Sequence, residues 1–142
     1  MKKNRLPSEY PFDFELIGIV SSAREYKLAW HLNQLHEFHL VKVDDIKIEF
    51  SDNKQIRVSI LEDVNEFNKV HLIKNKLVSS NSSINQYLVP ELQQFDYLIK
   101  MSSQTQENWA NELLLRLKNI PAIDYSLQID ISRIKMKDNL LF

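Results

Sequence analysis

Glycine occurs only once in the 142 residues, at Gly18. Phosphate-binding loops of the Walker and Rossmann types need several glycines close together, so the sequence excludes both. Gly18 lies inside an apolar run, residues 14–21, that predicts a buried central strand. A glycine weakens a strand unless another group must approach its backbone closely. We therefore expect either a helix packed against the sheet or a ligand at Gly18.

The composition is that of a globular protein, with 44% hydrophobic and 26% charged residues. A chain of this length commonly forms one domain, so we expect residues 1–142 to fold as a single unit, with residues 1–12 loosely ordered. The net charge of −1 argues against binding to nucleic acid, which needs a concentrated positive field.

Cysteine is absent, which excludes disulfides, thiolate nucleophiles, iron–sulfur clusters and cysteine-bound zinc. The first residues lack the apolar run of a signal peptide. No stretch reaches the ~18 apolar residues that a membrane span needs. We therefore expect a cytoplasmic protein that does not contact a membrane.

Apolar runs and apolar–polar alternation predict seven strands. They cover residues 14–21, 39–43, 46–50, 55–61, 70–78, 97–101 and 123–129. A polar turn at residues 51–54 joins the third and fourth strands into a hairpin, and residues 79–85 form a surface loop.

Two segments have the periodicity of long helices. The first begins after Ser22 and extends to about Phe38, with Ser22 and Glu25 placed to form a capping box. Its sheet-facing stripe consists of Leu28, Leu32 and Leu35. The second covers residues 105–119 and ends before Pro121.

The two helical segments occur in similar surroundings, because each follows a strand that ends in a pair of serines. This similarity predicts an α+β fold with two βαβ-like units flanking antiparallel strands. We expect one mixed, mostly antiparallel sheet of about six or seven strands, with both long helices on one face. Residues 14–21 and 97–101 are then neighbouring central strands.

Residues 89–97 resemble the signature of a bacterial family called IPExxxVDY. The matching positions are Val89, Pro90, Glu91, Phe95, Asp96 and Tyr97, with valine and phenylalanine in place of the isoleucine and valine of the motif. The family is uncharacterised, so the resemblance implies no catalytic residue, cofactor or partner. The residues themselves indicate a structural role, in which Pro90 starts a helical turn and Phe95 packs inward.

The serine pairs are the best candidates for ligand contacts. Ser21 and Ser22, together with Ser102 and Ser103, lie between strand ends and helix starts, where backbone amides favour anions. If the two strands are neighbours, both turns converge on one crevice, and Arg24 adds positive charge there. The alternative is that these serines only cap the helices.

Metal binding is not expected. His31, His36 and His39 lack the spacing of three or four residues that lets two rings on one helix reach one ion, except where the pair spans the helix end. Asp44 and Asp45 are consecutive and point to opposite faces, so a turn explains them better than a carboxylate cluster with Asp52 and Asp63. We expect no cofactor.

Tyr26 and Trp30 are the best candidates for a partner surface. They are four residues apart on the first helix and lie opposite its leucine stripe. Either a partner covers them or residues 140–142 of the same chain do so. The sequence thus favours a non-catalytic interaction or adaptor module that acts as a homodimer through Tyr26 and Trp30. The alternative is a small-anion-binding protein or enzyme that uses the serine crevice.

Overall fold

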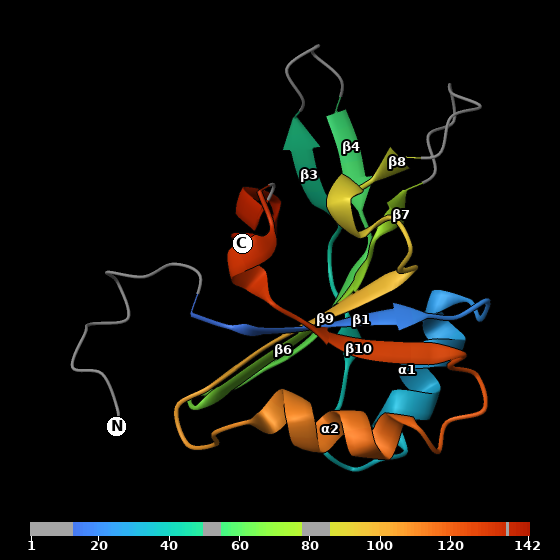
Figure 1. Ribbon diagram of the computed structural model, residues 1–142, viewed down its shortest axis with the longest axis vertical. Coiled ribbons are helices and arrows are strands. Elements are labelled where there is room, and N and C mark those ends of the chain that lie inside the picture. The colour runs from blue at the N-terminus through green and yellow to red at the C-terminus, as the bar shows by residue number, and fades with distance from the viewer. Residues whose placement is uncertain (1–12, 50–54, 78–85, 136) are drawn as a thin grey trace.

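The computed structural model describes residues 13–49, 55–77, 86–135 and 137–142. The expected disorder of residues 1–12, the turn at residues 51–54 and the loop at residues 79–85 lie outside the described residues. Within the described part the fold is α+β, as predicted (Figure 1). Of the described helices, none is long and apolar enough to cross a membrane.

The main sheet has six strands in the order β10-β1-β9-β6-β5-β2. These strands are β10 (Tyr125–Ile129), β1 (Glu15–Val20), β9 (Tyr97–Ser103), β6 (Asn68–Lys74), β5 (Ile60–Val64) and β2 (Val41–Lys42). β1 and β9 are neighbours, which confirms the prediction. Every pairing in this sheet is antiparallel, so it is not mixed. β9 and β10 run in the same direction with β1 inserted between them, and the βαβ-like unit around α2 is therefore split.

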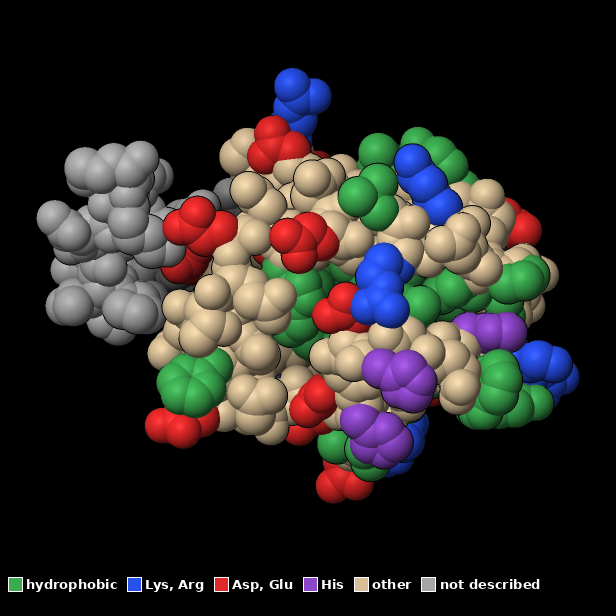
Figure 2. Space-filling model, turned by 90° about the horizontal axis from the view of Figure 1, so that it is seen from below, with side chains coloured by type: hydrophobic (Ala, Val, Ile, Leu, Met, Phe, Trp, Pro, Cys, Tyr) green, Lys and Arg blue, Asp and Glu red, His purple; other side chains and the backbone are tan. Residues whose placement is uncertain are grey.

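Helices α1 (Glu25–Asn33) and α2 (Trp109–Leu117) cover one face of the sheet, as expected (Figure 1). The buried cluster between them and the sheet includes Leu28, Leu32, Leu113, Leu117, Ile17, Leu72 and Ile99. Figure 2 looks onto the side where α2 lies. Apolar, acidic and basic side chains are interspersed on that side rather than gathered into one large patch.

Short elements cover part of the opposite face. They are the hairpin of β3 (Ile46–Glu49) and β4 (Gln55–Val58), the pair β7 (Lys76–Leu77) and β8 (Gln86–Tyr87), and the 3-10 turns η2 (Pro90–Leu92), η3 (Ile131–Arg133) and η4 (Lys137–Leu140). Their apolar side chains form a second buried cluster with the sheet. The β3–β4 hairpin confirms the predicted pairing.

Two of the predicted strands are interrupted. The segment at residues 55–61 divides at Ser59, where the chain passes from β4 in the hairpin to β5 in the main sheet. The segment at residues 70–78 divides at Asn75, where the chain passes from β6 to β7. The apolar alternation of Ile56, Val58 and Ile60 continues through the change at Ser59 and therefore does not reveal it.

The predicted capping box is wrong. Arg24 occupies the N-cap of α1 and makes no side-chain cap hydrogen bond. Glu25 instead accepts a hydrogen bond from the Ser59 hydroxyl at 2.6 Å. α1 ends at Asn33 rather than near Phe38, and His36 adopts the left-handed conformation with φ of 61°.

Gly18 makes room for a side chain of the family-like motif. A Cβ at Gly18 would lie 2.6 Å from atoms of the Phe95 ring. Phe95 is buried in the cluster opposite the helices. The close approach is therefore made by an aromatic ring on the far face, and the two explanations considered from the sequence, helix packing and a ligand, are both wrong.

Asn75 organises the turn that contains the motif. Its side-chain amide donates hydrogen bonds to the carbonyl oxygens of Leu92 and Phe95, both at 2.9 Å, and its Oδ1 accepts one from the Val89 amide at 3.0 Å. Asn75 is completely buried. Three backbone groups of the turn thus obtain partners from one side chain, so the structural role expected for the motif has a physical basis.

The segment after β10 is fastened to the rest of the fold by polar contacts. Glu91 Oε1 accepts a hydrogen bond from the Lys135 amide at 2.7 Å, and Asn139 donates one to the Leu88 carbonyl oxygen at 2.8 Å. Leu140 is fully buried in the second cluster. These contacts fix residues 137–142 over the face of the sheet that the helices do not cover.

Candidate functional site

Side chains on the face opposite the helices form rows that cross the main sheet. One row consists of Gly18, Leu98, Ile73 and Ile60, which are directly opposite one another in register, and it lies under Phe95 and its neighbours. The next row consists of Leu16, Lys100, His71 and Glu62. The third contains Ser102, Lys69 and Val64. The face thus changes from apolar to polar along the strands.

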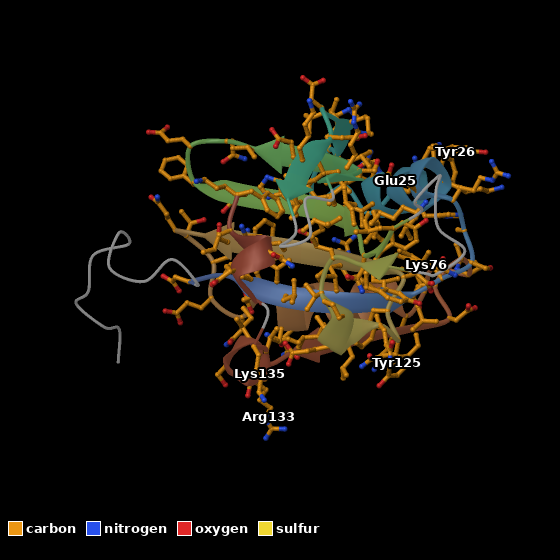
Figure 3. All side chains as sticks on the ribbon, turned by 90° about the horizontal axis from the view of Figure 1, so that it is seen from above. Glu25, Tyr26, Lys76, Tyr125, Arg133 and Lys135 are labelled. Atoms are coloured by element: carbon orange, nitrogen blue, oxygen red, sulfur yellow. The ribbon has the colours of Figure 1, made fainter. Side chains whose placement is uncertain are left out.

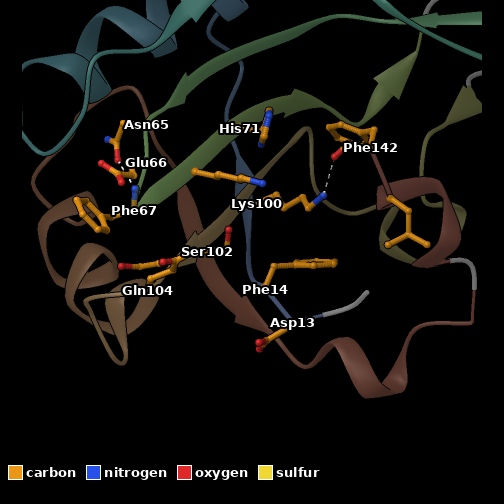
Figure 4. A pocket seen from close by; sticks show the side chains of 13 residues that line it. Asp13, Phe14, Asn65, Glu66, Phe67, His71, Lys100, Ser102, Gln104 and Phe142 are labelled. Carbon is orange, nitrogen blue, oxygen red and sulfur yellow. Dashed lines mark hydrogen bonds between the residues drawn. The ribbon is translucent and has the colours of Figure 1, made fainter. Parts of the chain in front are cut away.

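The polar rows form the floor of a cavity of about 370 Å³, which we call the open cleft (Figure 4). Its chemically important lining consists of Phe14, Lys69, His71, Lys100, Ser102 and Phe142. Charged, hydroxyl and imidazole groups therefore lie in one hollow with the phenyl rings of Phe14, Phe67 and Phe142. Such a mixture of apolar walls and a few polar groups is typical of small-molecule sites.

Lys100 is the central cation of the open cleft. Its Nζ lies 4.9 Å from the centre of the Phe14 ring and 4.5 Å from that of Phe142. The same atom donates hydrogen bonds to the backbone oxygens of Leu140 at 2.6 Å and Phe142 at 3.4 Å. Burial, reinforced by the charge of Lys69, lowers the pKa of Lys100 to about 8.

His71 lies directly opposite Lys100 in the register of β6 and β9. Its Nε2 is 3.3 Å from Glu62 Oε1, and its ring meets the Phe142 ring edge-on, with 5.5 Å between centroids. Burial and the charge of Lys100 lower the pKa of His71, although the Glu62 carboxylate acts in the opposite direction. The structure thus favours a neutral imidazole that is oriented by a carboxylate.

The two serines at this end of β9 differ in their availability. Ser103 accepts hydrogen bonds from the amides of Thr105 and Gln106 and donates one to Asn68 Oδ1, so it stabilises the turn after β9. It caps no helix, because α2 begins only at Trp109. Ser102 lies in register with Lys69 and lines the open cleft. Ser102 is therefore the better candidate for a ligand contact.

The other serine turn is at the opposite end of the sheet, and the predicted convergence of the two turns is wrong. Because β1 and β9 are antiparallel, the end of β1 near Ser21 lies beside Tyr97, whereas Ser102 follows Met101, which pairs with Glu15. Antiparallel neighbours place their carboxyl ends at opposite edges. A shared crevice would have required parallel strands.

Ser21, Ser22 and Arg24 border a separate, shallow hollow of about 450 Å³ together with Lys74, Lys76, Asp96 and Asp124. Ser21 has a structural role there, because its hydroxyl donates to the Ala122 carbonyl oxygen at 2.6 Å and accepts from the Ala23 amide at 3.1 Å. Asp96 Oδ2 accepts a hydrogen bond from the Ser21 amide at 2.9 Å. Acidic and basic groups are mixed in this hollow, so it favours an anion less than the open cleft does.

Tyr97 completes this end of the sheet. Its hydroxyl donates a hydrogen bond to the Ala23 carbonyl oxygen at 2.7 Å. Burial, together with the nearby carboxylates of Glu25 and Asp96, raises the pKa of Tyr97 to about 12. Tyr97 thus presents a fixed neutral hydroxyl at this position, which suits a structural contact.

The histidine and aspartate candidates do not form a metal site within the described residues, where no group of three possible metal ligands occurs. Asp63 accepts a hydrogen bond from the His39 amide at 2.9 Å, and Asp45 pairs with Lys42 at 2.8 Å. Asp52 lies outside the described residues.

Tyr26 and Trp30 are strongly exposed on α1, at 71% and 58% of their surface. Figure 3 shows Tyr26 on the outer side of that helix. The possibility that the chain's own last residues cover them is wrong. Leu140 is buried in the cluster on the other face of the sheet, and Phe142 contacts His71 and Lys100. Whether a partner covers the two aromatic side chains stays a prediction.

Sequence reasoning missed Lys100, His71 and Phe14. Alternation within residues 97–101 places Lys100 on the same strand face as Leu98. A lysine on an otherwise apolar face was the one signal in the sequence that could have indicated this site. The role of Lys100 in a cleft becomes clear only when β6 and β1 are placed beside β9.

Comparison with protein-family models, curated proteins and solved structures finds no match to this chain.

Proposed function

We propose that the protein binds a small organic anion in the open cleft. The main supporting observation is that Lys69, Lys100 and Ser102 line one hollow from two neighbouring strands. Within this hollow the Lys100 Nζ lies against the rings of Phe14 and Phe142. Amine and hydroxyl groups bind a carboxylate or phosphate, whereas the phenyl rings favour an apolar body on the same ligand. The sequence-based alternative placed an anion site in a crevice between two serine turns. The proposal made here places the anion in the open cleft, near Ser102 at the end of β9.

The rim of the open cleft restricts the charge of this anion. Asp13 and Glu66 also line the hollow, so its positive groups are partly balanced. A ligand with one anionic group and an apolar body therefore fits better than a polyanion. Phenylacetate is a suitable probe, because it carries one carboxylate and one ring.

The first prediction is that phenylacetate raises the melting temperature at constant ionic strength, since a ligand that binds only the folded state stabilises it. Lys69→Ala removes one charged donor and should weaken binding roughly tenfold, as measured by calorimetric titration. Lys118→Ala is the matched control, because Lys118 is exposed at the end of α2 and outside the cleft lining.

Equal weakening by Lys69→Ala and Lys118→Ala would contradict the assignment to the cleft. An equal rise in melting temperature with chloride would reduce the effect to general screening of charge. Inorganic phosphate and acetate separate the two parts of the ligand: if they bind as tightly as phenylacetate, the phenyl rings of the protein contribute nothing to recognition.

A second candidate function is the interaction module indicated by the sequence, with a second copy of the chain on α1. The observation that favours it is the exposure of Tyr26 and Trp30 on the outer side of that helix. Large aromatic side chains are frequent anchors of protein interfaces.

A cytoplasmic location and membership of the IPExxxVDY family remain proposals as well. The second of these rests on the sequence of residues 89–97 alone.

The second prediction concerns this interface. Trp30→Ala should cost roughly 2–4 kcal/mol of association free energy and shift the sedimentation of the protein toward monomer. Circular dichroism should stay unchanged, because Trp30 is mostly exposed. Leu127→Lys is the matched control on β10, which is an edge strand and carries the exposed side chains Tyr125 and Leu127. A dimer that Leu127→Lys dissociates and Trp30→Ala leaves intact would place the interface on the sheet edge and contradict the α1 interface.

A further inference from the structure

We propose that Lys100 forms an imine with a carbonyl group of the bound ligand, which makes that ligand an oxo acid. This inference rests on the proposed function of the open cleft and names the class of its ligand. Three features carry it: the placement of a primary amine between two phenyl rings, a carboxylate-oriented imidazole directly opposite, and anion-binding groups one row away.

The surroundings of Lys100 favour a nucleophilic amine. A neutral amine has two N–H groups and one lone pair. The backbone oxygens of Leu140 and Phe142 can accept from both N–H groups, which leaves the lone pair for a ligand. The apolar walls and Lys69 hold the pKa near 8, so roughly a tenth of the amine is neutral at pH 7. Lysines are activated in this way, by desolvation or by a neighbouring cation, when they form Schiff bases.

The step balances without an oxidant or a reductant. The Nζ lone pair attacks the carbonyl carbon of the ligand, and the electrons of the C=O bond move to the oxygen, which takes up a proton. Loss of one N–H proton gives a neutral carbinolamine. The hydroxyl group then leaves with a second proton as water, and the nitrogen loses its last hydrogen as the C=N bond forms.

His71 is the residue placed to move these protons. Its contact with Glu62 Oε1 is made through Nε2, which leaves Nδ1 to accept and return a proton when the imidazole is neutral. Glu62 is a positioning residue, since it acts through His71. The other charged groups that line the cleft are Asp13, Glu66 and Lys69.

The position of the anionic group follows from the register. Ser102 and Lys69 are directly opposite each other and lie two residues along their strands from Lys100 and His71. Successive side chains on one face of a strand are about 6–7 Å apart. A carboxylate held by Ser102 and Lys69 therefore presents an adjacent carbonyl carbon toward Lys100. A 2-oxo acid has this arrangement, and phenylpyruvate adds a ring for the apolar walls.

The test uses phenylpyruvate with cyanoborohydride, which reduces an imine to a stable secondary amine. Peptide mapping by mass spectrometry should show the adduct on Lys100 at least tenfold faster than on any other lysine of the chain. The mapping is done on the wild-type protein, so it does not depend on a variant that folds. Lys100→Arg keeps the charge and should abolish the adduct, whereas Lys118→Arg should leave its rate unchanged.

The outcomes separate this inference from the proposed function. If phenylacetate binds and phenylpyruvate gives no adduct on Lys100, anion binding stands and imine formation is overturned. If neither acid binds, both are overturned. Adducts spread evenly over the lysines would also overturn the inference. His71→Gln should slow adduct formation at least tenfold at a phenylpyruvate concentration that saturates the variant, and an unchanged rate would remove His71 from the step.

Discussion

Replacement of Asn75 by alanine is expected to lower the free energy of unfolding by about 3–5 kcal/mol. The Asn75 side chain supplies hydrogen bonds to the backbone groups of Val89, Leu92 and Phe95. All of them lie in or beside the buried turn, so water cannot replace the lost partner at low cost. Urea denaturation followed by circular dichroism measures the loss.

Asn75→Asp sharpens this prediction, because it keeps the shape and replaces the donor that faces two carbonyl oxygens by an acceptor. Burial next to these oxygens raises the folded-state pKa of the new carboxyl group, and the variant should therefore lose further stability as the pH rises. Asn119→Ala, at an exposed position just after α2, is the control and should change stability by less than about 0.5 kcal/mol. A loss of under 1 kcal/mol for Asn75→Ala would mean that the turn is held by packing alone.

Gly18→Ala is expected to destabilise the fold by about 3 kcal/mol, at the upper end of the usual cost of overpacking a core. The added methyl group would lie 2.6 Å from the Phe95 ring. The ring is fully buried beneath the motif turn and has little room to move. Thermal and urea denaturation report the change.

The double variant Gly18→Ala with Phe95→Ala tests the cause. Phe95→Ala removes the Cγ and Cδ atoms of the ring that clash with the added methyl group, so the cost of Gly18→Ala should fall by at least about 1.5 kcal/mol in that background, which a double-mutant cycle measures. An equal cost of Gly18→Ala in both backgrounds would show that the strand backbone, rather than the ring, requires glycine at this position.

Much of the fold could be predicted because it depends on local patterns. The leucine stripe of α1 faces the sheet and Tyr26 and Trp30 face outward, since a period of 3.6 residues fixes opposite faces of a helix. The hairpin of β3 and β4 follows from clear alternation on both sides of a polar turn. The neighbouring position of β1 and β9 is also confirmed.

Strand direction could not be predicted, because two strands have the same pattern whether they pair in parallel or antiparallel. The crevice between Ser21 and Ser102 depended on that direction and is wrong for this reason. The capping box at Ser22 and Glu25 matched the local pattern, but the tertiary contact of Glu25 with Ser59 replaced it. A sequence motif of four residues cannot predict a hydrogen bond to a residue that is distant in the sequence.

The candidate site depends on residues that are distant in the sequence. His71 and Lys100 become neighbours only through the register of β6 with β9. Phe14, which directly precedes β1, contacts Lys100 with its ring. Asn75 presents a similar difficulty, because an asparagine between two strands usually indicates a turn. Its partners lie in residues 89–95, and no spacing rule connects them.

The position of β1 in the sheet has a consequence for synthesis of the protein. β1 leaves the ribosome before the other strands, yet its register joins Gly18 to Leu98 on one side and to Leu127 on the other. Both edges of the most apolar strand therefore stay unpaired until most of the chain has been made. Such nonlocal pairing slows folding and exposes strand edges to aggregation. Ribosome-bound chains that end before β9 should depend on chaperones, because no native neighbour of β1 exists at that stage.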